Sequence, residues 1–233
     1  MNFAIVLSGG TGSRLPGLGV PKQYYKAGQK PVIAYSLETL AEIGMFQKLV
    51  IVAQEEWQSF LLPYLEEGKG RFVFACPGEN RQLSIYHGLL SLKDDASEDD
   101  IVLIHDGARP MTSKALFKSC IREAECADGA MPVLPMKDTV YYSKDGKAVT
   151  SLLERECIFA GQAPEAFRYG KYLRAVEALL PEEILLIHGS SEPALKAGMN
   201  IRLVEGEEAN FKITTASDLE RFCRYLEGRE GQG

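Results

Sequence analysis

The chain has 233 residues, of which 45% are hydrophobic and 25% are charged, an ordinary balance for a soluble globular protein. Its formal net charge of −6 argues against extended nucleic-acid binding, which requires a basic face, so we expect no nucleic-acid partner. No apolar run approaches the roughly 18 residues that cross a bilayer, and the first apolar run has no leader segment before it, so we expect no membrane partner. Five scattered cysteines without C-x-x-C spacing argue against disulfides or a zinc site and predict a cytoplasmic location.

Short β-rich runs alternate with segments of helical periodicity along the chain. The predicted strands are residues 3–8, 48–53, 71–76, 101–105, 130–134 and 201–205. The predicted helices are residues 31–44, 55–67, 80–92, 112–127, 169–180 and 217–227. This alternation predicts an α/β fold, with a single domain over residues 1–233 in which helices cover both faces of a mostly parallel sheet. Because ligands bind beyond the carboxyl ends of the strands in such sheets, we expect the functional site there.

The first predicted strand runs into a glycine-rich loop that carries two cations. The loop contains Gly9, Gly10 and Gly12, and Arg14 and Lys22 follow. Glycines let backbone N–H groups approach a polyanion closely, and fixed cations offset its charge. The segment lacks both the G-K-[ST] of a Walker loop and the third glycine of a dinucleotide fingerprint. A purely structural turn remains an alternative for the glycines alone, but the two cations favour a nucleoside triphosphate.

A short helix start and an isolated lysine are weaker candidates. Gly78 follows a predicted strand, and Arg81 and Ser84 fall in the first turns of the next helix. A helix terminus and a hydroxyl suit contact with a nucleobase, ribose or phosphate, although a plain helix start has the same spacing. Lys212 stands just before the last predicted helix and by itself resembles an ordinary surface lysine.

The apolar run at residues 101–104 leads into His105 and Asp106, with Arg109 shortly after. A carboxylate at the carboxyl end of a buried strand is the expected position of a metal ligand in a nucleotide site. The alternatives are that Asp106 caps the next helix or forms a salt bridge with Arg109. His105 is expected to pack at the end of the strand.

Residues 137–159 break the alternation of strands and helices. Two β-rich segments flank Asp145-Gly146, a dipeptide that is typical of hairpin turns. The segment therefore predicts a β-hairpin arm inserted into the α/β order. Because an exposed hairpin is marginally stable alone, we expect the arm to pack against a second subunit.

Taken in chain order, these motifs resemble the family of CTP-dependent polyol-phosphate cytidylyltransferases, whose two best-known branches make CDP-methylerythritol and CDP-ribitol. The matching segments are residues 7–14, 21–23, 105–110, 137–139, 162–167 and 210–215, together with Arg81, Ser84 and Gly88-Leu89. The resemblance implies a Rossmann-like, three-layer nucleotidyltransferase fold with the hairpin arm inserted. It also implies a homodimer, Mg²⁺ as cofactor, and transfer of CMP from CTP to a polyol phosphate with release of pyrophosphate.

The resemblance also implies roles for individual residues. The catalytic cations would be Arg14, Lys22 and Lys212, and Asp106 would hold Mg²⁺. The nucleotide would be bound by Ser8, Gly9, Gly10, Thr11, Gly12, Ser13, Gly78, Arg81, Ser84 and Asp106. The acceptor would be bound by Arg109, Thr139 and Arg155, the last two reaching across a homodimer interface.

The chain departs from the family pattern at three places. Residues 188–193 replace an acidic pair and a Ser-Leu stretch, Ala209 replaces a second metal-binding aspartate of some members, and Glu165 replaces a glutamine. These departures leave the acceptor and the second metal ligand open. Gly9-Gly10, Trp57 and Gly161-Gln162 resemble the ribitol branch more than the methylerythritol branch. The alternatives are a sugar-phosphate nucleotidyltransferase that uses another triphosphate and a non-catalytic nucleotide-binding relative.

Overall fold

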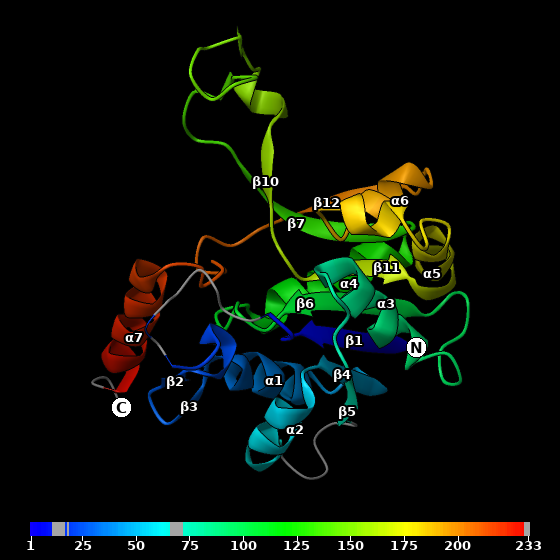
Figure 1. The fold of residues 1–233 in the computed structure, drawn as a ribbon, viewed down its shortest axis with the longest axis vertical. Coiled ribbons are helices and arrows are strands. Elements are labelled where there is room, and N and C mark those ends of the chain that lie inside the picture. Colours follow the sequence, from blue (N-terminus) through cyan, green and yellow to red (C-terminus); the bar gives the residue numbers. More distant parts are fainter. Residues whose placement is uncertain (11–16, 18, 66–71, 231–233) are drawn as a thin grey trace.

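The computed structural model describes residues 1–10, 17, 19–65 and 72–230, and an eight-stranded sheet forms its centre (Figure 1). The hydrogen-bonded order is β10-β7-β11-β6-β1-β4-β5, and β12 also pairs with β7. The strands are β1 (Asn2–Leu7), β4 (Lys48–Val52), β5 (Phe72–Ala75), β6 (Ile101–Asp106), β7 (Gly129–Pro135), β10 (Phe159–Gly161), β11 (Glu165–Arg168) and β12 (Ile201–Glu205).

Most strand pairs in this sheet are parallel, as expected. Strand β1 runs parallel to β4 and β6, β4 to β5, and β7 to β12, whereas β11 and β10 are antiparallel to their neighbours. All six predicted strands are present, which confirms the α/β class. Strands β10 and β11 were not among the predicted strands, because they are only three and four residues long and lack β-branched residues.

Helices cover both faces of the sheet and form the expected three layers. They are α1 (Val32–Ile43), α2 (Glu55–Leu61), α3 (Arg81–Leu90), α4 (Lys114–Glu125), α5 (Tyr169–Glu177), α6 (Glu192–Lys196) and α7 (Ala216–Glu230). Alternate residues of β1 point to opposite faces, so Phe3 and Ile5 pack with α3 and α5 while Ala4 and Val6 pack with α1 and α4. Both faces of β1 are therefore buried, which explains its continuous apolar run. No helix in the described ranges combines the length and the apolar character that a membrane span requires.

Helix α2 is shorter than the sequence pattern predicts. It ends at Leu61 and continues as a 3₁₀ turn over Leu62–Tyr64. Pro63 has no backbone N–H to donate to the carbonyl four residues earlier, which interrupts the α-helical hydrogen bonding.

The predicted arm is a hairpin that projects away from the sheet (Figure 1). Its strands β8 (Tyr141–Tyr142) and β9 (Ser151–Leu152) pair antiparallel. At the turn, Gly146 has a φ of 70°, a left-handed conformation that favours glycine, and the carboxylate of Asp145 accepts the N–H of Lys147 at 2.9 Å. Strand β10 then returns the chain to β7.

Helix α7 packs on one end of the molecule beside the small hairpin of β2 (Lys26–Ala27) and β3 (Lys30–Pro31) (Figure 1). Its apolar side contributes Leu219 and Phe222 to a separate small core that also contains Val32 and Ile213. Because Ile213 is fully buried, this core fixes the chain immediately after Lys212.

Candidate active site

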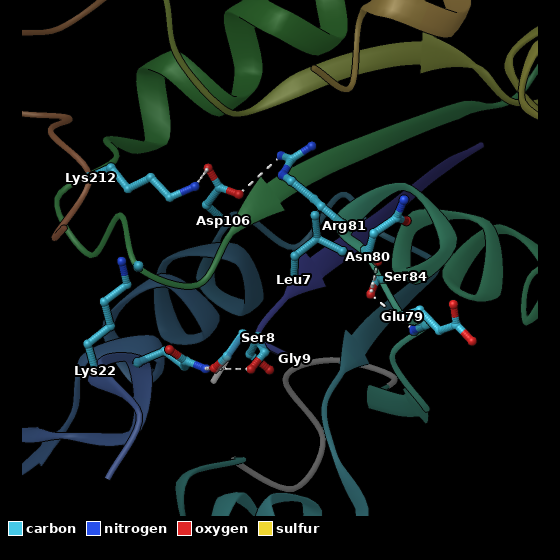
Figure 2. Close-up of a pocket in the computed structure, with 14 residues that line it drawn as sticks. Leu7, Ser8, Gly9, Lys22, Glu79, Asn80, Arg81, Ser84, Asp106 and Lys212 are labelled. Carbon is cyan, nitrogen blue, oxygen red and sulfur yellow. Dashed lines mark hydrogen bonds and ion pairs between the residues drawn. The ribbon is translucent and has the colours of Figure 1, made fainter. Parts of the chain in front are cut away.

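A cavity of about 370 Å³ opens at the carboxyl ends of β1 and β6 (Figure 2). It lies beyond the carboxyl ends of the strands, where open α/β sheets bind their ligands. The residues that line it are Leu7, Ser8, Gly9, Gly10, Lys22, Gln23, Gly78, Glu79, Asn80, Arg81, Ser84, Asp106, Ala108 and Lys212. Residues from distant parts of the chain therefore meet in one cavity.

The loop that follows β1 is held from two sides. The Gln23 amide donates hydrogen bonds to the carbonyls of Ser8 and Gly10, both at 2.6 Å, and the Tyr24 hydroxyl donates to the Ser8 carbonyl at 3.0 Å. Trp57 stacks on Tyr24, with ring centroids 4.3 Å apart. Gln23 was not among the predicted site residues, although it stands in the matching segment 21–23. Its side chain fixes the start of the loop.

Glycine is required where this loop meets the segment before α3. A Cβ atom on Gly9 would overlap the ring of Pro77, and one on Gly78 would overlap Leu83. Close approach of the two backbones therefore needs both glycines. The segment is further tied by the Gly78 N–H, which donates to the Ser84 hydroxyl at 3.1 Å.

Helix α3 begins with a side-chain cap that orients its first turn. The Asn80 carboxamide oxygen accepts the N–H of Leu83 at 2.8 Å, and the Ser84 hydroxyl donates to the Asn80 carbonyl at 2.8 Å. This arrangement places Arg81 and Ser84 on the cavity wall.

Three cations surround the Asp106 carboxylate at the end of β6. Lys212 Nζ lies 2.9 Å from one oxygen, a guanidinium nitrogen of Arg81 lies 3.1 Å from the other, and Arg109 Nε approaches within 3.6 Å. Burial raises the pKa of Asp106, but the positive charges of Arg81 and Lys212 outweigh it and hold that pKa well below the usual range. Asp106 is therefore ionised at neutral pH.

The sequence left two structural roles open for Asp106, a salt bridge with Arg109 and a cap of the next helix, and the structure contains only the first. The salt bridge with Arg109 is present, but it is shared with two further cations. The helix-cap reading is wrong, because the side chain of Ser113 caps α4 by accepting the N–H of Leu116 at 3.0 Å. His105 is fully buried against Phe117, in keeping with the expected packing role.

Lys22 and Lys212 enter the cavity from opposite ends of the sequence (Figure 2). Lys22 is buried in the 3₁₀ turn Lys22–Tyr24, whereas Lys212 comes from the loop before α7. The structure thus brings together Ser8, Gly9, Gly10, Lys22, Gly78, Arg81, Ser84, Asp106 and Lys212. Thr11, Gly12, Ser13 and Arg14 lie outside the described residues.

A buried amide network supports the loop that carries Lys212. Asn210 is fully buried; its side chain donates to the carbonyl of Ala163 at 2.7 Å and accepts the Thr112 hydroxyl at 2.6 Å. Its backbone carbonyl accepts a hydrogen bond from Arg109 at 2.6 Å. The sequence signal for Asn210 was its place in Asn210-Phe211-Lys212, but a neutral amide carries no charge that would have marked it as a site residue.

Ser190 and Glu165, two residues that stand where the chain departs from the family pattern, are close to Arg81. The Ser190 hydroxyl accepts a hydrogen bond from Arg81 at 2.7 Å, and the Ser190 carbonyl accepts the Tyr172 hydroxyl at 2.7 Å. Burial raises the pKa of Glu165 to about 7, although the positive charge of Arg81 lowers it. Neither Ser190 nor Glu165 was predicted as a site residue, because their proximity to Arg81 depends on long-range packing.

The residues expected to bind the acceptor do not all gather at the cavity. Arg109 contacts Asp106 but does not line the cavity, and Thr139 and Arg155 are exposed on the arm, outside the cavity of their own chain. Arg155 donates to the Lys137 carbonyl at 3.2 Å, at the base of the arm. Their roles stay predictions.

The residues present at the cavity suit one hard divalent cation. Within the described ranges, no group of three or more His, Cys, Asp or Glu side chains is arranged to hold a metal. Mg²⁺ commonly keeps several waters and takes only one or two carboxylates together with substrate phosphates. The ionised Asp106 carboxylate therefore fits a cation that arrives with a phosphate ligand.

Comparisons with known proteins point to one family. The family model described as "IspD: 2-C-methyl-D-erythritol 4-phosphate cytidylyltransferase" matches residues 2–227. A 2-C-methyl-D-erythritol 4-phosphate cytidylyltransferase of Rubrobacter xylanophilus is 35% identical, with 99% of this chain and 96% of the relative covered. A ribitol-5-phosphate cytidylyltransferase of Lacticaseibacillus paracasei is 28% identical, with 99% of this chain and 100% of the relative covered.

A solved structure agrees with these sequence relatives. The 4-diphosphocytidyl-2C-methyl-D-erythritol synthase of Anaerococcus prevotii superposes with a TM-score of 0.85 at 26% identity, covering 97% of this chain and 96% of that one. The expected nucleotidyltransferase fold is confirmed. With a family model that spans nearly its whole length, this chain belongs to the IspD family of cytidylyltransferases.

Proposed function

We propose that this enzyme transfers the cytidylyl group of CTP to the phosphate of a polyol phosphate and releases pyrophosphate. The observation that carries the proposal is that Lys22 lines the same cavity as Asp106, whose carboxylate Arg81 and Lys212 contact. Four groups from separate elements form a site of fixed charges, as a reaction between two polyanions requires.

The chemistry itself needs little from a general base. A phosphate monoester has a second pKa near 6, so at neutral pH its oxygen is already a nucleophile. That oxygen bonds to the α-phosphorus of CTP as the bond from this phosphorus to the pyrophosphate oxygen breaks. The main obstacle is repulsion between the two anions, which positioning and preset positive charge reduce.

Each cavity residue has a distinct proposed role in that reaction. Lys22 and Lys212, together with Arg14, contact the triphosphate and the charge that develops in the transition state. Ser8, Gly9 and Gly10, which line the cavity, bind the nucleotide together with Thr11, Gly12 and Ser13. Gly78, Arg81 and Ser84 bind the cytidine part of CTP, since they form the cavity wall at the start of α3.

We also propose that Mg²⁺ is the cofactor and that Asp106 holds it, with substrate oxygens and water as the remaining ligands. When bound, Mg²⁺ neutralises part of the triphosphate charge and orients the phosphates. The low pKa of Asp106 supports this role, because the carboxylate is ionised at neutral pH, where CTP is charged.

The acceptor is proposed to bind between this cavity and the arm of a second subunit. Arg109, although it does not line the cavity, contacts the cavity residue Asp106 from the protein's own chain. Thr139 and Arg155 project from the arm, and in a homodimer they would reach the partner's cavity. The exposed apolar side chains of the arm, among them Tyr141 and Leu152, support a subunit interface there.

Ribitol 5-phosphate is the acceptor that we favour over 2-C-methyl-D-erythritol 4-phosphate. Trp57, one of the residues that resemble the ribitol branch, supports Ser8 through Tyr24, and Gly9 allows the contact with Pro77. Gly9 lines the cavity, and Trp57 acts on it only indirectly, through Tyr24.

A pyrophosphate-release assay tests the activity and the acceptor together. The purified protein is mixed with CTP, Mg²⁺ and either ribitol 5-phosphate or 2-C-methyl-D-erythritol 4-phosphate, and the CDP-polyol is identified by mass. Release with one acceptor identifies the substrate. Release only with UTP or GTP and a sugar phosphate would indicate the other nucleotidyltransferase class, and binding of CTP without release would indicate a non-catalytic relative.

A further inference from the structure

A buried amide side chain outside the cavity contacts the loop that carries Lys212. Gln162 directly follows β10, the strand that returns the chain from the arm, and is only 7% exposed. Its backbone N–H donates to the carbonyl of Pro132 in β7 at 2.8 Å, so the central sheet fixes its position. Gln162 has no charge and does not line the cavity. Any effect that it has on the reaction must therefore pass through other residues.

The carboxamide of Gln162 spends its whole hydrogen-bonding capacity on the turn at residues 207–210. Its nitrogen donates to the carbonyl of Glu207 at 2.9 Å and to the carbonyl of Asn210 at 3.4 Å. Its oxygen accepts the backbone N–H of Glu207 at 3.1 Å and the side-chain amide of Asn210 at 3.3 Å. An amide has two N–H donors and two acceptor lone pairs, so every one of them is used. Glutamine is the natural side chain of this length that offers both.

The approach of the loop to Gln162 is close. The N–H of Gly206 donates to the carbonyl of Val133 in β7 at 2.9 Å. A Cβ atom on Gly206 would lie 2.6 Å from the side-chain oxygen of Gln162 and 2.9 Å from the carbonyl oxygen of Val133, so only glycine allows the chain to pass here. The carboxylate of Glu207 also accepts the hydroxyl of Ser113, the cap of α4. The turn is thus fixed between β7, the end of β10 and α4.

Lys212 lies between this turn and a second anchor of the same loop. Beyond it, the N–H of Ile213 donates to the carbonyl of Ala108, in the loop after β6, at 2.8 Å. The backbone of Lys212 is therefore held on both sides, and its Nζ reaches the Asp106 carboxylate at 2.9 Å. Because a lysine side chain has many rotamers, the place of its ammonium depends on how firmly this backbone is held.

We propose that Gln162 is a positioning residue that, by holding the turn at residues 207–210, sets the place of the Lys212 ammonium in the cavity. The inference rests on the proposed function for the task of Lys212, which is contact with the triphosphate. A loop that is ordered before CTP arrives lowers the entropy that binding must remove. Because Gln162 directly follows β10, the same amide joins the foot of the arm to the cavity loop.

Labelling of the Lys212 amine in the free protein tests the positioning directly. Gln162→Met keeps the length of the side chain and removes its hydrogen bonds to the turn. Losing one net hydrogen bond changes a local opening equilibrium by roughly 10-fold, so a soluble acylating reagent should label Lys212 about 10-fold faster, as measured by mass spectrometry. Lys93, an exposed lysine, is the internal reference whose rate should stay the same. An unchanged rate at Lys212 overturns the proposal.

A double-mutant cycle tests whether the effect on CTP passes through Lys212. Gln162→Met should raise the Kd for CTP, measured by calorimetry, by about 10-fold in the wild-type background. In a Lys212→Ala background the same substitution should leave the Kd unchanged, because the group that it positions is gone. An equal rise in both backgrounds would show that Gln162 acts on another part of the site and would overturn the proposal.

Gln162→Glu decides the matter if Gln162→Met does not fold. It keeps the shape and the acceptor oxygens but has no N–H groups for the carbonyls of Glu207 and Asn210. Labelling of Lys212 should therefore rise in this variant too. Labelling at the wild-type rate would contradict the positioning role.

Tyr169→Phe is the control for lost stability. The buried Tyr169 hydroxyl donates to the carbonyl of Leu89 at 3.0 Å, at the end of α3 that lies away from the cavity. The control should lower the melting temperature and change neither the labelling of Lys212 nor the Kd for CTP. An equal rise in both would assign the effect to lost stability and overturn the proposal. If the wild-type protein releases no pyrophosphate with either acceptor, the proposed function fails, while the labelling rates still decide the role of Gln162.

Discussion

Lys22 is the residue whose charge most directly tests the proposed reaction. Lys22→Ala is expected to lower kcat by roughly 10²-fold, the size of effect seen when one preset donor to developing negative charge is lost. The measurement is steady-state pyrophosphate release at saturating CTP and acceptor. Lys26→Ala, which removes an exposed lysine of β2 outside the cavity, should leave kcat unchanged. Near-normal turnover of folded Lys22→Ala would remove Lys22 from the proposed mechanism.

Glu165 also predicts a dependence of stability on pH. Its pKa is raised by burial from 4.5 to about 7, so the unfolded chain loses this proton at lower pH than the folded one. The stability that the neutral carboxyl contributes is complete below pH 4.5 and is lost as pH rises through 7. Relative to the wild type, Glu165→Gln should therefore gain free energy of unfolding from pH 5 to 7 and level off above. Urea titrations at pH 5, 6, 7 and 8 measure this difference, and a pH-independent difference would contradict it.

Residue patterns predicted some of the site well and other parts not at all. Arg81, Asp106 and Lys212 are charged residues next to predicted strands or helices, so the sequence marks them. Ser190 and Glu165 were noticed only as departures from the family pattern. The contact of Ser190 with Arg81, and the effect of the Arg81 charge on Glu165, follow from the packing of three separate segments, and no local rule describes that packing.

At the scale of elements, the arm predicts a separation between acceptor and nucleotide binding. Arg155 lies on the arm, away from the cavity of its own chain. Arg155→Ala is therefore expected to raise the KM for the acceptor and to leave the Kd for CTP almost unchanged. Acceptor titrations and calorimetry with CTP measure the two effects. A collapse of CTP affinity would show that Arg155 has been misplaced.

Element boundaries were predicted best where the hydrophobic pattern was long. The six strands and the hairpin arm agree with the structure, because their apolar runs and the Asp145-Gly146 turn are local signals. Helix α2 was predicted too long, since its apolar pattern continues past Pro63. The short strands β10 and β11 were missed because tertiary pairing, and not residue preference, makes them strands.

At the scale of the whole molecule, the projecting arm predicts self-association. Leu152 is 63% exposed on a hairpin of only two strands, which is marginally stable alone. Leu152→Asp should weaken the homodimer, as measured by light scattering over a range of protein concentrations. Leu186→Asp, the same change at another exposed leucine outside the arm, should not. A wild-type protein that stays monomeric at high concentration would contradict the proposed dimer.

By itself, the sequence determined the α/β class, the inserted arm and the family, because apolar periodicity, turn dipeptides and ordered motifs depend on neighbouring residues. The tertiary structure alone decided which side chains meet: Lys22 and Lys212 line one cavity, and Arg81 lies between Asp106 and Ser190. The physical reason is that strand order and helix packing, which join residues far apart in the chain, set these distances. The charge that each group carries in the site follows from those distances and from burial.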